Sequence, residues 1–250
     1  MSPLEGLAIM AAGLAAGAIN TIVGSGSLIT FPTLLAFGYP PLVANVSNTV
    51  GLVPGSVSGA IGYRRELTGQ RARAIRLGTA AGVGGLTGGL LLLVLPASSF
   101  GIIVPWLILL ACGLMAIQPR MSRYMATRRH VIADHPLPLT IGVYLTGIYG
   151  GYFGAAQGVI LMALLAIFLT DDLQRLNGLK NVLAALVNGV AAVLFIIAAP
   201  VDYSVVLLLA IGSIVGGQIG ASVGRRLPSA VLRLVVICVG LLVALRLLLG

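Results

Sequence analysis

Long apolar runs, joined by short connections, dominate this chain of 250 residues. Hydrophobic residues make up 58% of it and charged residues only 8%, and its mean hydropathy is +1.09. A soluble domain carries about 25% charged residues. Most of the runs approach the roughly 20 residues that a membrane-spanning helix needs, and they lack the alternating pattern of barrel strands. The sequence therefore predicts an all-α polytopic membrane protein.

Ten apolar segments are expected, five on either side of a polar stretch. Two of them, 27–38 and 158–170, are too short to span a bilayer. Short segments flanked by glycine and polar residues are typical of discontinuous helices, either re-entrant or part of a tilted hairpin. Because Glu5 stands where a signal peptide would be basic, we expect a first membrane segment rather than a cleaved leader. The other segments are 4–23, 42–62, 77–95, 100–117, 138–154, 175–199, 203–223 and 229–249.

Arginine placement predicts how the chain is oriented. Arginines gather between 63 and 76, in the stretch 118–137 and at 225–226, whereas the connections 96–100 and 199–203 hold no Lys or Arg. Cytoplasmic loops are enriched in these residues, so the Arg-rich connections should be inside and both termini outside. The expected parts are a first membrane repeat (1–117), a cytoplasmic linker (118–137) and a second repeat (138–250). Since each half has an odd number of segments, the second runs opposite to the first.

The two halves also share residues in the same order, as an inverted-topology repeat of about 5+5 segments requires. Inverted repeats are common in secondary transporters, which bind substrate at the repeat interface near the middle of the membrane. One short discontinuous or re-entrant helix is expected in each repeat. The matched residues are Gly17 with Gly147, Gly24 with Gly154, Asn45 with Asn177, and Asn48-Thr49 with Lys180-Asn181.

Each short segment opens with a turn that predicts an anion site. The first turn contains Ser25, Gly26 and Ser27, and the second contains Ala156 and Gln157. A helix start offers unpaired N–H groups and a partial positive charge, and glycine lets a ligand approach the backbone. Hydroxyl and amide side chains add further donors. The alternative is a tight turn in which serine only caps the helix.

The segments that follow these turns carry a matched set of polar side chains. Polar groups inside a membrane are expensive and mark binding sites more often than lipid contacts. The alternative is hydrogen bonding between helices. For Lys180, the only lysine of the chain, the alternatives are snorkelling to the headgroups and a cation that neutralises an anionic substrate. The set comprises Asn45, Asn48, Thr49, Asn177, Lys180 and Asn181.

Several functional classes are disfavoured. All six acids fall in connections or at segment ends, so a carboxylate-lined cation site or proton relay is hard to build. The net charge of +9 comes from loop arginines without aromatic interleaving, which argues against nucleic-acid binding. No nucleotide-binding, hydrolase or metalloprotease motif occurs, and Cys112 and Cys238 stand alone. We expect no enzyme activity, no cofactor and no metal.

Four stretches resemble the TauE/SafE family of sulfite and organosulfonate exporters. They are 17–32 with its turn 24–27, the segments 38–40 and 44–49, and the run 147–158, which reads Gly-Ile-Tyr-Gly-Gly-Tyr-Phe-Gly-Ala-Ala-Gln-Gly. The similarity covers essentially the whole chain. It implies a permease in the plasma (inner) membrane of a prokaryote that moves small sulfur-containing anions. Family members often have more glycine at the two turns, where this chain has Ser25, Ser27 and Ala155-Ala156.

The sequence thus predicts a secondary transporter of small anions, sulfite or sulfur-containing organic acids, that works by alternating access. Its expected partners are the anion and the lipid bilayer, with no nucleic acid, while a coupling ion and a homodimer are open alternatives. One rival is a permease for a neutral or cationic solute. The other is an accessory membrane subunit that transports nothing.

Overall fold

The computed structural model describes residues 1–127, 136–223 and 229–249, and within them every regular element is an α-helix. The first half contains α1 (Pro3–Ile22), α2 (Ser27–Ala36), α3 (Pro41–Gly62), α4 (Arg71–Val94) and α5 (Ala97–Thr127). The second contains α6 (Pro136–Tyr152), α7 (Gln157–Phe168), α8 (Leu173–Ala198), α9 (Tyr203–Val223) and α10 (Ser229–Leu249). The all-α prediction and its segment order are confirmed, with α2 and α7 as the two short helices.

Five helices of the described residues are long and apolar enough to cross a membrane. They are Pro3–Ile22, Arg71–Val94, Ala97–Arg120, Leu173–Ala198 and Tyr203–Ser222. Many large apolar side chains of these helices point outward, among them Trp106 at 61% exposure and Ile197 at 77%. An exposed apolar surface of this extent suits lipid rather than water. The chain is therefore a multi-pass membrane protein.

Two helix boundaries differ from the sequence prediction. The arginines of the connection 63–76 do not all lie in a loop, because α4 already begins at Arg71 and carries Arg73 and Arg76 in its first two turns. Likewise α5 continues to Thr127, ten residues beyond the expected end at 117. Arginine is a good helix former, so the polar, Arg-rich composition did not mark the helix ends. Residues 128–135 of the expected linker, and Arg225 and Arg226, lie outside the described residues.

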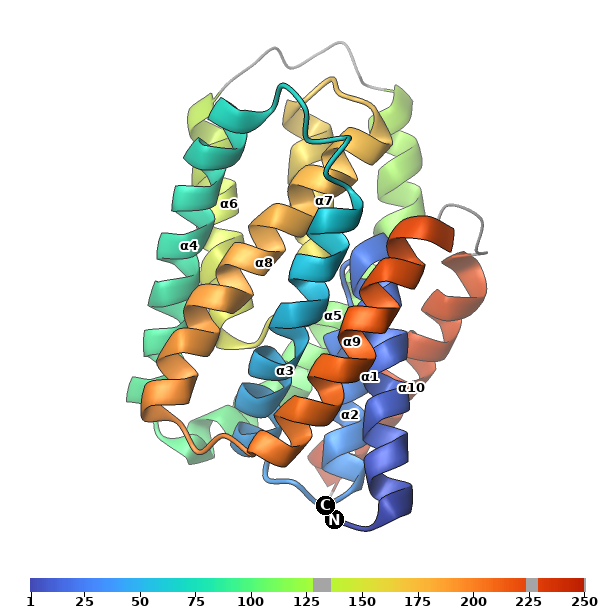
Figure 1. Cartoon of the computed structure of the whole chain (residues 1–250). Coiled ribbons are helices and arrows are strands. Elements are labelled where there is room, and N and C mark those ends of the chain that lie inside the picture. Colours follow the sequence, from blue (N-terminus) through green and yellow to red (C-terminus); the bar gives the residue numbers. More distant parts are fainter. Residues whose placement is uncertain (128–135, 224–228, 250) are drawn as a thin grey trace.

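The two halves interlock rather than stand side by side. Helix α1 packs along α9, and α4 packs along α6, while α3 contacts both α8 and α9. Each of these pairs joins the first half to the second. Most pairings have a counterpart when the halves are exchanged, as α1 with α2 corresponds to α6 with α7, and α2 with α10 corresponds to α7 with α5. In Figure 1 both ends of the chain lie at the same end of the bundle, opposite the ends of α5 and α6 that flank 128–135.

Glycines bring the interlocking helices into close contact. At the α1–α9 contact a Cβ on Gly17 would lie 2.8 Å from the Cα of Ser213, and at the α4–α6 contact a Cβ on Gly84 would lie 2.9 Å from the Cα of Gly147. Small residues let helix backbones approach closely in membranes. The small-residue spacings at Gly13, Gly17, Gly84, Gly88, Gly212, Gly216 and Gly220 therefore serve internal packing between the halves.

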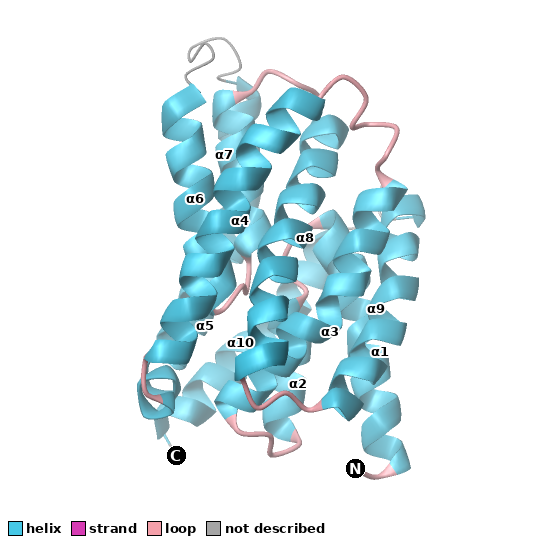
Figure 2. Ribbon diagram, turned by 60° about the vertical axis from the view of Figure 1, so that its left-hand side comes forward, coloured by secondary structure: helices cyan, strands magenta, loops and turns pink. Residues whose placement is uncertain are grey.

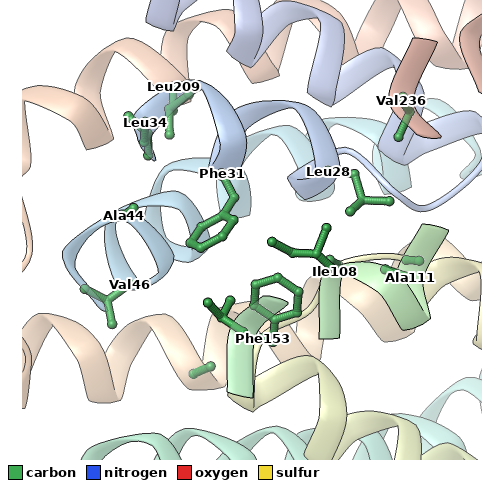
Figure 3. Packing of buried hydrophobic residues seen from close by; sticks show 14 of the residues in the cluster. Leu28, Phe31, Leu34, Ala44, Val46, Ile108, Ala111, Phe153, Leu209 and Val236 are labelled. Atoms are coloured by element: carbon green, nitrogen blue, oxygen red, sulfur yellow. The ribbon is translucent and has the colours of Figure 1, made fainter. Parts of the chain in front are cut away.

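An apolar cluster fixes the two short helices to each other. The ring of Phe31 on α2 meets the ring of Phe153, in the turn before α7, edge-to-face with centroids 5.3 Å apart. Ile108 and Ala111 of α5 and Val236 of α10 belong to the same cluster (Figure 3). Aromatic pairs of this geometry contribute about 0.5–1.5 kcal/mol beyond their buried area. The cluster holds the start of α2 beside the turn that precedes α7.

Candidate functional site

The two glycine turns meet inside the bundle. The amide of Gly158, at the start of α7, donates to the carbonyl oxygen of Gly24 over 3.0 Å. A Cβ on either glycine would overlap the backbone of the other. Figure 2 shows these connections as short loops within the bundle, away from both of its ends. The N-terminal ends of α2 and α7 thus converge at one interior point, where helix dipoles and N–H groups favour negative charge.

Backbone strain marks the second turn. Ala156, the residue directly before α7, has φ +58°, and it is the one non-glycine residue with positive φ in the described part of the chain. Gly24 and Gly154 adopt the same left-handed region with φ +87° and +77°. An alanine in this region costs of order 1–2 kcal/mol. The hydroxyl of Tyr149 donates to the carbonyl oxygen of Ala155 and helps to hold the turn.

Two buried donors at this point have no partner. Ser25 is 1% exposed and Gln157 2% exposed, yet the Ser25 Oγ and the Gln157 Nε2 make no hydrogen bond within the described residues. The serine-cap alternative is wrong for Ser25, since Gly26 precedes α2 and no side chain caps it. A buried polar group without a partner costs about 1–3 kcal/mol. Both donors are therefore suited to meet an acceptor that enters the site.

Asn48 ties α3 to the first turn of α2. Its Nδ2 donates to the Ser27 Oγ over 3.2 Å, and its Oδ1 accepts from the hydroxyl of Thr30. The Asn48 amide thus makes hydrogen bonds between helices, which was the alternative to a binding role for this residue. Ser27 accepts in its bond with Asn48, which leaves the hydroxyl hydrogen of Ser27 for a further acceptor. This serine is half-buried and lies in the same turn as Ser25.

Asn45 reaches from α3 to the end of α6. Its Nδ2 donates to the carbonyl oxygen of Tyr152 over 3.0 Å, whereas its Oδ1 is buried and finds no hydrogen-bond partner in the described ranges. The hydroxyl of Thr49 donates to the Asn45 carbonyl one turn back, over 3.0 Å. Thr49 is therefore satisfied by its own helix and offers no donor to a ligand here.

Lys180, Asn177 and Asn181 all hold the end of α1. The Lys180 Nζ donates to the carbonyl oxygens of Asn20 and Thr21, each over 3.1 Å. Thr21 also accepts from Asn177 over 3.3 Å and from Asn181 over 3.2 Å. Lys180 is 0% exposed, so it does not snorkel to the headgroups. Its charge lies at a helix C-terminus, the position where a cation is stabilised by the helix dipole.

The site residues predicted from sequence thus surround four helix ends: the C-termini of α1 and α6 and the N-termini of α2 and α7. Sequence reasoning missed Asn20, Thr21, Thr30 and Tyr152, which supply partners to the predicted residues. Three of these act through backbone carbonyls, which leave no signature in a sequence. Their position just before the two glycine turns was the available signal.

Charged side chains join the two halves at the Arg-rich end. Asp171 accepts from Arg73 and from Arg175, and Arg175 also donates to the carbonyl of Thr68 over 3.1 Å. Partial burial raises the pKa of Asp171, but the hydrogen bonds and charges of Arg73 and Arg175 outweigh burial and hold it below its usual value. The cluster fixes the 63–70 connection and α4 to the start of α8. Within the described residues no group of three or more His, Cys, Asp or Glu could hold a metal ion.

Comparisons with known proteins agree with this architecture. The chain is 25% identical over 240 residues to "Probable membrane transporter protein ORF9" of Sinorhizobium, covering 96% of this chain and 91% of the relative. It is 26% identical over 222 residues to "Probable membrane transporter protein YfcA" of Escherichia coli K12, covering 88% and 81%. A "Probable membrane transporter protein" of Haemophilus influenzae is 27% identical over 216 residues, covering 84% and 81%.

No solved structure is significantly similar to this chain. The family model described as "Sulfite exporter TauE/SafE" matches residues 9–247, which is nearly the whole chain. The chain therefore belongs to the TauE/SafE sulfite exporter family of membrane transporters.

Proposed function

We propose that this transporter moves small anions of the sulfite and sulfonate class, and that it binds them where α2 and α7 meet. The observation that carries the proposal is the pair of buried, unpartnered donors, the Ser25 Oγ and the Gln157 Nε2, at two converging helix N-termini. Hydrogen bonds to a charged acceptor contribute about 1.5–3 kcal/mol each. An oxyanion that enters the site would satisfy both donors, together with the hydroxyl of Ser27.

Charge balance favours an anion over a cation at these N-termini. The described acids lie at helix starts or in connections, and none of the described carboxylates belongs to the two turns. Taking an unpaired ion out of water is very costly, so a bound ion needs opposite charge nearby. Lys180 supplies the one formal positive charge among the predicted site residues, and the helix dipoles add partial charges. In our proposal the positive charge of Lys180, which is held at the end of α1, attracts the anion electrostatically.

The proposed mechanism is alternating access by an inverted repeat. Helix α1 pairs with α9, and α4 pairs with α6 in the matching way. These two pairs, each with one helix from either half, support two equivalent units that rock against each other around a fixed site. Ser25, Asn45, Asn48, Gln157 and Lys180 are all buried, so in our proposal an anion reaches them only after a change of conformation. We propose that the Arg-rich end is cytoplasmic, with both termini outside, in the plasma membrane of a prokaryote.

The test is binding of sulfite and of short alkylsulfonates to the purified protein, followed by uptake into proteoliposomes. Ser25→Ala and Gln157→Leu should each weaken anion binding roughly tenfold or more, the loss expected for one hydrogen bond to a charged group. Ser222→Ala is the matched control, because its hydroxyl bonds only to its own helix and is exposed.

The outcomes separate the proposal from its rivals. Absence of binding to any small anion at millimolar concentration would refute the anion proposal. Uptake of a neutral or cationic solute that anions do not inhibit would favour the first rival. An obligate partner chain with no bound solute would favour an accessory subunit. We propose no catalytic activity, in keeping with a transporter family.

A further inference from the structure

The two halves provide different groups at equivalent helix ends. In the first half Asn45 donates to the last residue of α6, and in the second half Asn177 donates to the carbonyl of Thr21 at the end of α1. These asparagines are matched positions of the repeat. Three residues further along each helix, however, the first half has Asn48 and the second half has Lys180. The equivalence makes it meaningful to ask what takes the place of the lysine in the first half.

At the end of α1 the position is taken by a cation of the protein itself, the ammonium of Lys180. The ammonium of Lys180 lies 3.1 Å from the carbonyl oxygens of both Asn20 and Thr21. The last turn of a helix leaves carbonyl oxygens without intrahelical partners and carries partial negative charge. The Oδ1 of Asn177, beside the same turn, is also buried and has no partner in the described part of the chain. Two last-turn carbonyls thus hold the positive charge, and the Asn177 Oδ1 makes no hydrogen bond to it.

At the end of α6 the equivalent last-turn carbonyls have no lysine ammonium beside them. The shorter Asn48 does not reach α6, because both atoms of its amide are bonded to Ser27 and Thr30 of α2. Gly150 and Gly151, at the positions that match Asn20 and Thr21, lie in the last turn of α6. Asn45 is 1% exposed, and its Oδ1 has no partner among the described residues. The Nδ2 of the same amide is fixed on Tyr152, which holds this oxygen beside the end of α6.

We propose that a sodium ion binds at the C-terminal end of α6, between the Asn45 Oδ1 and the last-turn carbonyls of Gly150 and Gly151. It would take the position that the ammonium of Lys180 takes at α1. All of these ligands are neutral oxygens, so the site suits a monovalent cation; a site for Ca²⁺ or Mg²⁺ would include carboxylates. Helix C-termini and backbone carbonyls coordinate Na⁺ in other transporters with broken helices.

Cation binding here would couple to the anion site. The ends of α6 and α7 are joined by the turn 153–156, so a cation on α6 lies next to the converging N-termini. With Lys180 it would offset the charge of a divalent anion from both halves of the protein. This coupling role rests on the proposed function, whereas the cation site itself does not.

The test is thermal unfolding of the purified protein in detergent, without any sulfur anion. NaCl is titrated against choline chloride and KCl at constant ionic strength, so that the cation alone changes. The wild-type melting temperature should rise with NaCl and saturate, whereas choline should have no such effect. Asn45→Ala should weaken the apparent Na⁺ affinity by more than tenfold, since losing even a supporting group lowers the affinity of a metal site by roughly 10–100-fold.

Matched variants keep the proposal falsifiable. Asn177→Ala is the control, because Lys180 already occupies the equivalent position at the end of α1, and it should keep the sodium response of the wild type. If Asn45→Ala does not fold, Asn48→Lys provides an independent variant: an ammonium reaching α6 should abolish the sodium response. A wild-type protein that responds equally to Na⁺ and choline would overturn the site, whether or not anion transport is found. Equal loss in Asn45→Ala and Asn177→Ala would overturn its location.

Discussion

The backbone of Gly158 donates to the backbone of Gly24 over 3.0 Å, and this contact joins the two turns from which the short helices begin. Neither residue has room for a side chain, since a Cβ on one would overlap the backbone of the other. The contact explains why both turns are rich in small residues. It also places the starts of α2 and α7 so that their dipoles act on the same point.

Gly158→Ala should therefore separate the two turns. Overpacking of a closely packed interior costs about 1–3 kcal/mol, and we expect a lower melting temperature together with reduced anion binding. Gly189→Ala in α8 is the control, because nothing lies within 4 Å of a Cβ at that position. Alanine is the better helix former by about 1 kcal/mol, so the control should be as stable as the wild type or slightly more so. An unchanged Gly158→Ala protein would contradict the contact.

Lys180→Met should destabilise the end of α1. The change keeps most of the side-chain volume but leaves the Asn20 carbonyl without its ammonium donor, at a cost of about 1–3 kcal/mol for a buried unpaired group. Asn181→Ala should cost less, because Thr21 keeps Asn177 and Lys180 as donors. Thermal unfolding of both variants in detergent measures the difference. Anion binding that stays at wild-type affinity in Lys180→Met would show that the lysine has only the structural role.

The charged cluster at the Arg-rich end predicts a dependence of stability on pH. Because Arg73 and Arg175 hold the pKa of Asp171 below its usual value, its ionised form favours the folded state. This contribution is complete above the unfolded pKa of about 3.9 and is lost as the pH falls through the lower folded value. Asp171→Asn should thus lower the free energy of unfolding near neutral pH, by about 1 kcal/mol at most for a partly exposed pair. The free energy of unfolding of this variant should also fall less steeply than that of the wild type as the pH is lowered.

Asp172→Asn is the matched control for this experiment. Asp172 caps the start of α8 by accepting from the amides of Gln174 and Arg175, and asparagine is nearly as good a cap. Melting curves between about pH 3 and 7 at low salt should differ between the two variants. If Asp171→Asn and Asp172→Asn have the same pH profile, the ion-pair interpretation fails.

Glycines at the interlocking contacts should tolerate no side chain. Gly17→Ala in α1 and Gly84→Ala in α4 would each bring a Cβ within 3 Å of the backbone of the partner helix, and the helices would have to move apart. We expect each to cost about 1–3 kcal/mol in detergent unfolding. Gly113→Ala in α5, where a Cβ would meet open space, should be as stable as the wild type or slightly more so. Equal melting temperatures for all three variants would rule out close packing at α1–α9 and α4–α6.

The sequence by itself determined the helices and which polar residues are candidates for the site. Apolar run length predicted ten segments, most of them within a few residues of the observed helix ends, because burying a backbone in lipid requires helices of a set length; the exceptions are the start of α4 and the end of α5. The short lengths of 27–38 and 158–170 correctly marked α2 and α7. The free-energy cost of placing polar groups in lipid also singled out the predicted polar set, including Asn45, Asn48 and Lys180, because lipid tolerates few such groups.

Only the tertiary structure decided how those groups are used. Which helices pair depends on contacts between distant segments, so the interlocking of α1 with α9 and of α4 with α6 was not predictable from local pattern. The partners of Lys180 are backbone carbonyls, which every residue has and no sequence displays. The same holds for Asn45 and Tyr152. Sequence located the polar groups that are costly in lipid, and the fold determined which of them are satisfied; it leaves the Ser25 Oγ and the Gln157 Nε2 buried without a partner among the described residues.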